Sequence, residues 1–199
     1  MFRALPLILI LMIVGCASGP TSTPPGTVQN LSEGSYSALI ASNTSKTDRY
    51  SGFYQTFQAE MTILSNEVQT ASLRQKAHFL QWDEKQFQAE RDKLMQESTS
   101  LARFFMRFYS PETDYNDLHK GKTIWRVYLE YNGNRFEGKV RKMTEKFVEL
   151  QTLYPYYDRF STPYEVTFSV PMTSVEKAKA KVILTSSLGS AEFSFPKGK

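Results

Sequence analysis

The chain has 199 residues, enough for one domain or two small ones, and its 41% hydrophobic and 22% charged residues are typical of globular proteins. It has 24 lysines and arginines against 20 aspartates and glutamates, without a long block of like charge. Nucleic-acid binding normally needs basic residues gathered on one face, so we expect no nucleic-acid partner. The single cysteine excludes an internal disulfide and any metal centre built on several thiolates.

Residues 1–15 have the pattern of an export signal. Arg3 is followed by an apolar run from Leu5 to Val14. That run is about half as long as the roughly 20 residues that a transmembrane helix needs. A short apolar core that follows a basic start and ends in small residues is typical of a cleaved signal peptide.

The residues Ile13-Val14-Gly15-Cys16 carry a more specific motif. They resemble the lipobox of bacterial lipoproteins, in which a branched apolar residue, a small or β-branched residue and Gly or Ala precede a cysteine. The resemblance implies cleavage before Cys16, a diacylglycerol thioether on its sulfur and acylation of the new amino group. The alternative is an ordinary secreted protein with a coincidental cysteine.

The resemblance also implies a location. The residues after Cys16 are Ala17 and Ser18, whereas an aspartate there tends to retain lipoproteins at the inner membrane of enteric bacteria. We therefore expect a protein of the cell envelope that contacts the membrane through its lipid anchor, at the outer membrane and facing the periplasm.

Residues 16–49 are rich in Ser, Thr, Gly and Pro. Such a composition buries too little apolar surface to offset the entropy lost on ordering. We expect a flexible tether between the anchor and the folded part. Docking onto the folded part is an alternative for the apolar patch at residues 36–41.

Residues 50–120 are expected to be helical, because no Gly or Pro occurs between Phe53 and Tyr109 and good helix formers fill the segment. Apolar residues recur at helical spacings: Phe57, Met61, Leu64, Val68 and Ala71, then Leu73, Leu80, Phe87, Leu94, Leu101 and Phe108 at intervals of seven. The second heptad position is weakly filled, so a strict coiled-coil seam is absent. The apolar stripe shifts near residue 72, so the segment is either a single helix or a helical hairpin.

A mostly polar helix of this length needs a surface to pack on. We expect it to pack within the protein, to self-associate, or to bind another envelope protein.

Residues 121–199 are expected to form a β domain. Residues 122–131 alternate in polarity, and Asn132-Gly133 is the strongest short hairpin signal. Further strands are expected in the segments 147–153, 164–170, 179–186 and 190–195, although 173–181 also has a helix-start pattern. The predicted fold class is α+β, with a long N-terminal helical segment followed by a C-terminal antiparallel β-sandwich or small barrel.

The segment 154–164 is unusually aromatic. Its aromatic side chains, which surround two prolines, are those of Tyr154, Tyr156, Tyr157, Phe160 and Tyr164. Aromatic loops can stack on sugars or peptides, so one hypothesis is binding of cell-wall glycan or peptide. The other is that the loop packs over the sandwich edge.

No catalytic constellation is visible. Neither His78 nor His119 neighbours a nucleophile in a recognisable motif, and no HExxH zinc motif or Gly-rich phosphate loop occurs. The acidic segment 112–119 fails the spacing of a calcium loop. We expect a non-catalytic protein without metal or cofactor, whose role is structural or protein–protein interaction, with ligand binding through residues 154–164 as the alternative.

Overall fold

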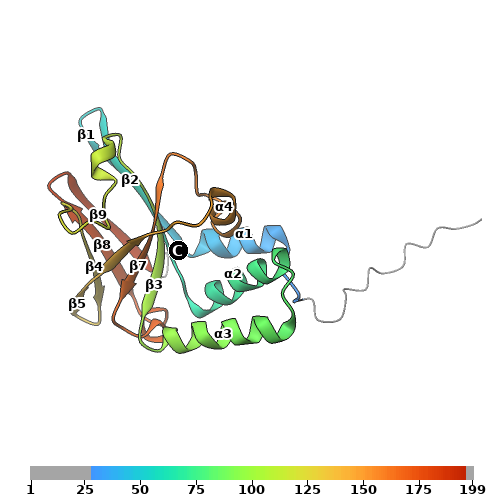
Figure 1. Ribbon diagram of the computed structural model, residues 1–199. Coiled ribbons are helices and arrows are strands. Elements are labelled where there is room, and N and C mark those ends of the chain that lie inside the picture. Colours follow the sequence, from blue (N-terminus) through green and yellow to red (C-terminus); the bar gives the residue numbers. More distant parts are fainter. Residues whose placement is uncertain (1–27, 196–199) are drawn as a thin grey trace, which may run out of the picture.

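The computed structural model describes residues 28–195, so the predicted signal peptide and Cys16 lie outside the described residues. Two antiparallel sheets and a layer of helices form three layers (Figure 1). The five-stranded sheet has the order β1 (Thr44–Ser51), β2 (Tyr54–Ile63), β3 (Ala102–Tyr109), β7 (Thr162–Phe168) and β6 (Lys139–Lys142). The four-stranded sheet has the order β5 (Asn134–Glu137), β4 (Arg126–Tyr131), β8 (Ala180–Ser186) and β9 (Gly189–Phe195). The helices are α1 (Glu33–Ser42), α2 (Asn66–Phe79), α3 (Glu84–Ser98), α4 (Phe147–Leu153) and the short α5 (Met172–Val175), with a 3-10 turn η1 (Thr113–Tyr115).

The main core lies between the two sheets. Alternate side chains of each strand point into it, as the period of two in a β-strand requires. The buried residues include Phe57, Ala59 and Met61 of β2, Phe104, Met106 and Phe108 of β3, and Val182, Leu184 and Phe193 of β8 and β9. The other face of the five-stranded sheet is covered by α1, α2 and α4 (Figure 1), which pack around Phe105.

The long helix predicted over residues 50–120 is wrong, because the helices are short and β2 and β3 occupy much of that segment. In β2 the apolar residues Phe57, Ala59, Met61 and Ile63 follow a period of two, and Phe57 and Met61, four residues apart, fit a helical period as well. In β3 both faces are covered, so "ARFFMRFY" is a nearly continuous apolar run that periodicity cannot distinguish from a buried helix. Only residues 66–98 form a helical hairpin, which turns at Leu80–Asp83 rather than near residue 72.

The predicted C-terminal position of the sandwich is also wrong. Its five-stranded sheet contains β1, β2 and β3 from the N-terminal half of the described chain. The expected hairpin at Asn132-Gly133 joins β4 and β5, and β8 and β9 form as expected. Residues 147–153, expected as a strand, are the helix α4, because Leu150 and Leu153 lie three residues apart on its buried face.

Residues 33–49, expected within the tether, form α1 and most of β1. The Ser32 side chain caps α1 by accepting a hydrogen bond from the Ser35 N–H at 3.3 Å. Tyr36 and Ile40, from the patch considered for docking, are the buried residues of this helix. Tyr36 and Ile40, one helical turn apart, therefore pack α1 into the hydrophobic cluster between the helices and the sheet.

The chain passes from one sheet to the other at Gly138. Its N–H donates to the carbonyl of Val127 in the four-stranded sheet at 2.8 Å, and the next residue begins β6 in the five-stranded sheet. A Cβ at this position would lie 2.8 Å from a ring carbon of Phe168 and 3.1 Å from Val166. Both side chains are fully packed in the sandwich core, so they have little room to move.

Gly138→Ala is therefore expected to lower the free energy of unfolding by about 1–3 kcal/mol through overpacking. The matched control is Gly34→Ala in α1, where no atom lies within 4 Å of the added Cβ. This control is expected to be neutral or to stabilise by about 0.5–1 kcal/mol, because alanine favours helix. Urea unfolding of both variants provides the measurement, and equal midpoints would contradict the expectation.

Candidate functional site

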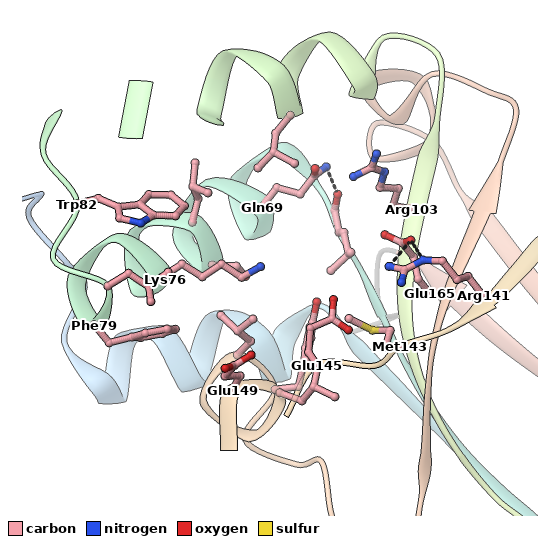
Figure 2. Close-up of a pocket in the computed structure, with 18 residues that line it drawn as sticks. Gln69, Lys76, Phe79, Trp82, Arg103, Arg141, Met143, Glu145, Glu149 and Glu165 are labelled. Carbon is pink, nitrogen blue, oxygen red and sulfur yellow. Dashed lines mark hydrogen bonds and ion pairs between the residues drawn. The ribbon is translucent and has the colours of Figure 1, made fainter. Parts of the chain in front are cut away.

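A cavity of about 380 Å³ lies on the outer face of the five-stranded sheet, between α2, α3 and α4 (Figure 2). We call it the α2–α4 cavity. Its volume falls within the range of small-molecule pockets, which is roughly 300–1,000 Å³. The walls come from segments far apart in the sequence, and most of the lining residues are apolar.

One face of α2 forms a wall of the cavity. Gln69, Leu73, Lys76 and Leu80 recur every three or four residues and therefore share a side of this helix. Gln69 is fixed by a hydrogen bond from its Nε2 to the Leu64 carbonyl at 2.6 Å. The spacing of α2 residues thus orients a continuous stripe toward the cavity.

The turn between α2 and α3 provides an apolar end. Phe79 is 40% exposed and Leu80 54% exposed, which is unusual for large apolar side chains. Trp82 is half-buried and packs against the cluster of Leu73, Ala77 and Phe87. Figure 2 shows Trp82 and Phe79 together at this end of the cavity.

The opposite end is charged and lies over the sheet (Figure 2). Arg141 of β6 donates through Nη2 to Glu165 of β7 at 3.0 Å, and the two residues are register partners. Arg103 of β3 forms an ion pair with Glu97 at the end of α3. The Arg103 Nε is buried and has no hydrogen-bond partner among residues 28–195.

Lys76 and two glutamates line the length of the cavity. In residues 28–195 the Lys76 ammonium makes no ion pair, and Figure 2 shows its side chain extending from α2 between the two ends. Glu145 and Glu149 lie on the α4 side and are exposed.

Tyr36 joins the elements that form the walls. Its hydroxyl donates to the Leu153 carbonyl of α4 at 2.8 Å and lies 3.0 Å from Ser72 Oγ of α2. Burial raises the pKa of the Tyr36 hydroxyl to about 12. This side chain ties α1 to α2 and α4, two of the helices that line the cavity.

The aromatic residues of the segment 154–164 are mostly packed inward. Tyr164 is fully buried, and Tyr157 is 7% exposed. The Tyr156 hydroxyl is hydrogen-bonded with Thr62, and burial raises its pKa. Phe160 is 84% exposed.

Of these five residues, Tyr154 is the one that lines the α2–α4 cavity. Its ring stacks on Phe105 with centroids 3.5 Å apart and planes 2° apart. Burial raises the pKa of the Tyr154 hydroxyl well above its usual value. The segment therefore supplies one wall of the cavity rather than an exposed stacking platform.

The β1–β2 hairpin carries a second apolar surface. At its tip Tyr50 is 61% exposed, Tyr54 is 82% exposed and Phe53 is entirely exposed. Gly52, with a φ of 62°, allows the tight turn. Figure 1 places this tip at the opposite end of the molecule from the α2–α3 turn, so it is separate from the cavity.

The residues weighed for metal binding or catalysis do not gather. Across residues 28–195 no cluster of three or more His, Cys, Asp or Glu side chains is arranged to hold a metal ion. Asp117 accepts a hydrogen bond from Thr123, and the His119 ring lies against Tyr164. In the same part of the chain, no helix has the length and apolar character needed to span a membrane.

Comparison of the chain with protein-family models, with curated proteins and with solved structures finds no match. The site is therefore argued from its own residues. The sequence places Lys76, Phe79 and Leu80 in a predicted helix but does not mark them as binding residues. The charged end of the cavity combines residues of β3, β6 and β7, which no local sequence pattern connects.

Proposed function

We propose that this chain is a non-catalytic binding protein of a bacterial cell envelope, anchored to a membrane through Cys16, and that its ligand binds in the α2–α4 cavity. The observation that carries the proposal is the cavity itself, which is open, largely apolar, charged at one end and held between three helices and a sheet. Its arginines face carboxylates in ion pairs, an arrangement suited to orienting a ligand rather than to activating a nucleophile.

This proposal replaces the helical segment as the interaction site, because the long helix does not form. It also moves ligand binding away from stacking on residues 154–164. Four of the five aromatic residues there, all except Phe160, pack in the hydrophobic clusters. Of these four, only Tyr154 also lines the cavity.

Filling the cavity is expected to weaken ligand binding. The probe is N-phenyl-1-naphthylamine, a neutral apolar dye whose fluorescence rises in a dry site, and it should bind the native protein saturably. Leu94→Trp adds bulk at a half-exposed position of the cavity wall and should weaken dye binding at least tenfold, roughly 1.4 kcal/mol.

The matched control is Val148→Trp on α4, at a position that is 67% exposed and does not line the cavity. It should bind the dye like the native protein. An absence of saturable binding, or equal affinity in both variants, would contradict the proposed site.

Anchoring has its own test. Cys16→Ser removes the only thiol that could be lipidated. Since stable anchoring takes two or more acyl chains, the variant is expected to move almost completely from the membrane to the soluble fraction. Fractionation followed by immunoblotting measures this shift, and retention of the variant in salt-washed membranes would refute lipid anchoring.

A further inference from the structure

The α2–α4 cavity has a polarity along its length. Phe79, Leu80 and Trp82 form the apolar end at the α2–α3 turn, and Arg103, Arg141 and Glu165 form the charged end over the sheet (Figure 2). A ligand that satisfies both ends must itself be amphipathic, because burying a polar group among the apolar residues would cost free energy. Its polar head would lie over β3 and β6.

The charged end has hydrogen-bond donors left over. A guanidinium carries five N–H groups. Arg141 uses Nε and Nη2 on a single oxygen of Glu165, at 3.1 and 3.0 Å. Arg103 donates through Nη2 to Glu97, and its Nε is buried out of reach of a ligand, so the donors that it can offer are on its terminal nitrogens. An acceptor on a ligand would satisfy the spare donors of both arginines.

Three cations and three carboxylates line the cavity, so the preference for a head group depends on which charges are still unpaired: Lys76, Arg103 and Arg141 against Glu145, Glu149 and Glu165. Glu97 and Glu165 already accept hydrogen bonds from the arginines. Glu145 and Glu149 are exposed, so water screens their charges. Lys76 is half-buried and makes no ion pair in residues 28–195, so it is the least screened unpaired charge of the lining and favours an anionic head over a cationic one.

The cavity walls also restrict the body of the ligand. The floor is the face of the five-stranded sheet, where β3, β7 and β6 pair their backbone groups with one another. A bound peptide would leave its own backbone polar groups without partners in such a site, which is costly. A hydrocarbon chain has no backbone polar groups that would need partners. The cavity volume of about 380 Å³ lies in the lower part of the range for ligand pockets, which fits a small ligand.

We infer that the α2–α4 cavity binds a single-chain fatty acid, whose carboxylate contacts Arg103 and Arg141 and whose chain extends toward Phe79 and Trp82. This inference rests on the proposed function and names the ligand class of the same site. Lys76 lies between the two ends and adds a third positive charge near the head group.

The experiment is competition against bound N-phenyl-1-naphthylamine by three ligands with the same chain: dodecanoate, dodecanol and dodecylammonium. Each is used below the concentration at which it forms micelles and at a pH where the carboxylate is ionised. A charge-assisted hydrogen bond contributes enough for at least a tenfold preference. Dodecanoate should therefore displace the dye at one tenth of the dodecanol concentration or less, and dodecylammonium should be weaker than both.

The preference should disappear when the arginines lose their charge. Arg103→Gln and Arg141→Gln should each reduce the preference for dodecanoate over dodecanol about tenfold, measured as the ratio of the two displacing concentrations within each variant. Arg141, 56% exposed, provides the variant least prone to unfolding. The matched control is Arg135→Gln on β5, whose partner Glu130 does not line the cavity.

The failures of the two proposals are distinguishable. An absence of dye binding to the native protein would refute the proposed function. Dye binding with equal or stronger competition by dodecanol or dodecylammonium would overturn the fatty-acid inference and leave the binding site in place. Dye binding that none of the three ligands displaces would also overturn the inference.

Discussion

Replacing Arg107 by alanine is expected to lower the free energy of unfolding by about 3–5 kcal/mol, the usual cost of removing one partner of a buried ion pair. Arg107 of β3 is 6% exposed. Its Nη2 donates to Glu60 Oε1 at 2.6 Å and its Nη1 donates to Asp158 Oδ2 at 2.6 Å. Because Glu60 is itself only 8% exposed, the alanine variant leaves a buried carboxylate without its nearest cation.

The loss should come from the weakly compensated Glu60 carboxylate, whose remaining cation Lys46 lies 3.8 Å away and is half-exposed, and not from the ion pair as such. The double variant Arg107→Met with Glu60→Leu removes both buried charges and is expected to recover much of the lost stability. Asp158 tolerates the change, since its side chain is 41% exposed and accepts hydrogen bonds from the Phe160 and Ser161 N–H groups.

An exposed arginine provides the comparison. Arg135 pairs with Glu130 at 2.5 Å, but its side chain is 57% exposed. Arg135→Ala is therefore expected to cost less than about 1 kcal/mol. Urea unfolding of the three variants measures the effects, and an Arg107→Ala cost as small as that of Arg135→Ala would show that water reaches the buried network.

The parts of the fold that the sequence predicts are those with strong local signals. Asn132-Gly133 marks the β4–β5 hairpin, and alternation marks β4, β8 and β9. The helix formers of residues 66–98 do form helices, capped by Ser65 and Asp83. In these segments local propensity and tertiary packing agree.

The failures occur where tertiary packing overrides a local signal. The β3 strand is buried on both faces because Phe104 enters the sandwich core and Phe105 enters the helical layer. In the sequence, Arg107 of the same strand is consistent with the polar face of a helix, although it is buried in an ion-pair network. Its partners lie 47 and 51 residues away in the sequence, so no local pattern could reveal them.

The candidate site follows the same rule. The helical spacing of Leu73 and Leu80 is visible in the sequence, but the charged end is not, because Arg103 and Arg141 come together only when β3, β7 and β6 pair. Tyr154 belongs to the segment that the sequence assigns either to ligand contact or to packing, and its ring stacks on Phe105 and lines the cavity. An aromatic residue in a loop-like sequence therefore indicates packing as readily as binding. Lipidation of Cys16 stays a prediction.

The stability of the folded chain is expected to fall steeply at alkaline pH because several buried tyrosines must lose protons. Burial raises the pKa of Tyr36 and of Tyr164 to about 12, and it raises the pKa of Tyr154 well above its usual value. The unfolded chain releases these protons near pH 10, so it binds fewer protons than the folded chain above that pH. The contribution of the protonated tyrosines to stability is thus complete below about pH 10, and it is lost as the pH rises through the pKa values of the folded chain. For Tyr36 alone the loss is about 2–3 kcal/mol.

The test is the dependence of the urea midpoint on pH, compared between the native chain and Tyr36→Phe. The variant loses the hydrogen bond to the Leu153 carbonyl, so it should be about 1 kcal/mol less stable at neutral pH. It should also lose stability less steeply above about pH 10, because one titrating group is gone. Tyr54→Phe, at a position that is 82% exposed, is the matched control and should follow the native curve. If the urea midpoints of all three chains fell equally steeply with pH, ionisation of Tyr36 would not be a cause of the loss of stability at alkaline pH. The Tyr36 hydroxyl, which joins α1 to α4, would then have to be more accessible to water than its burial indicates.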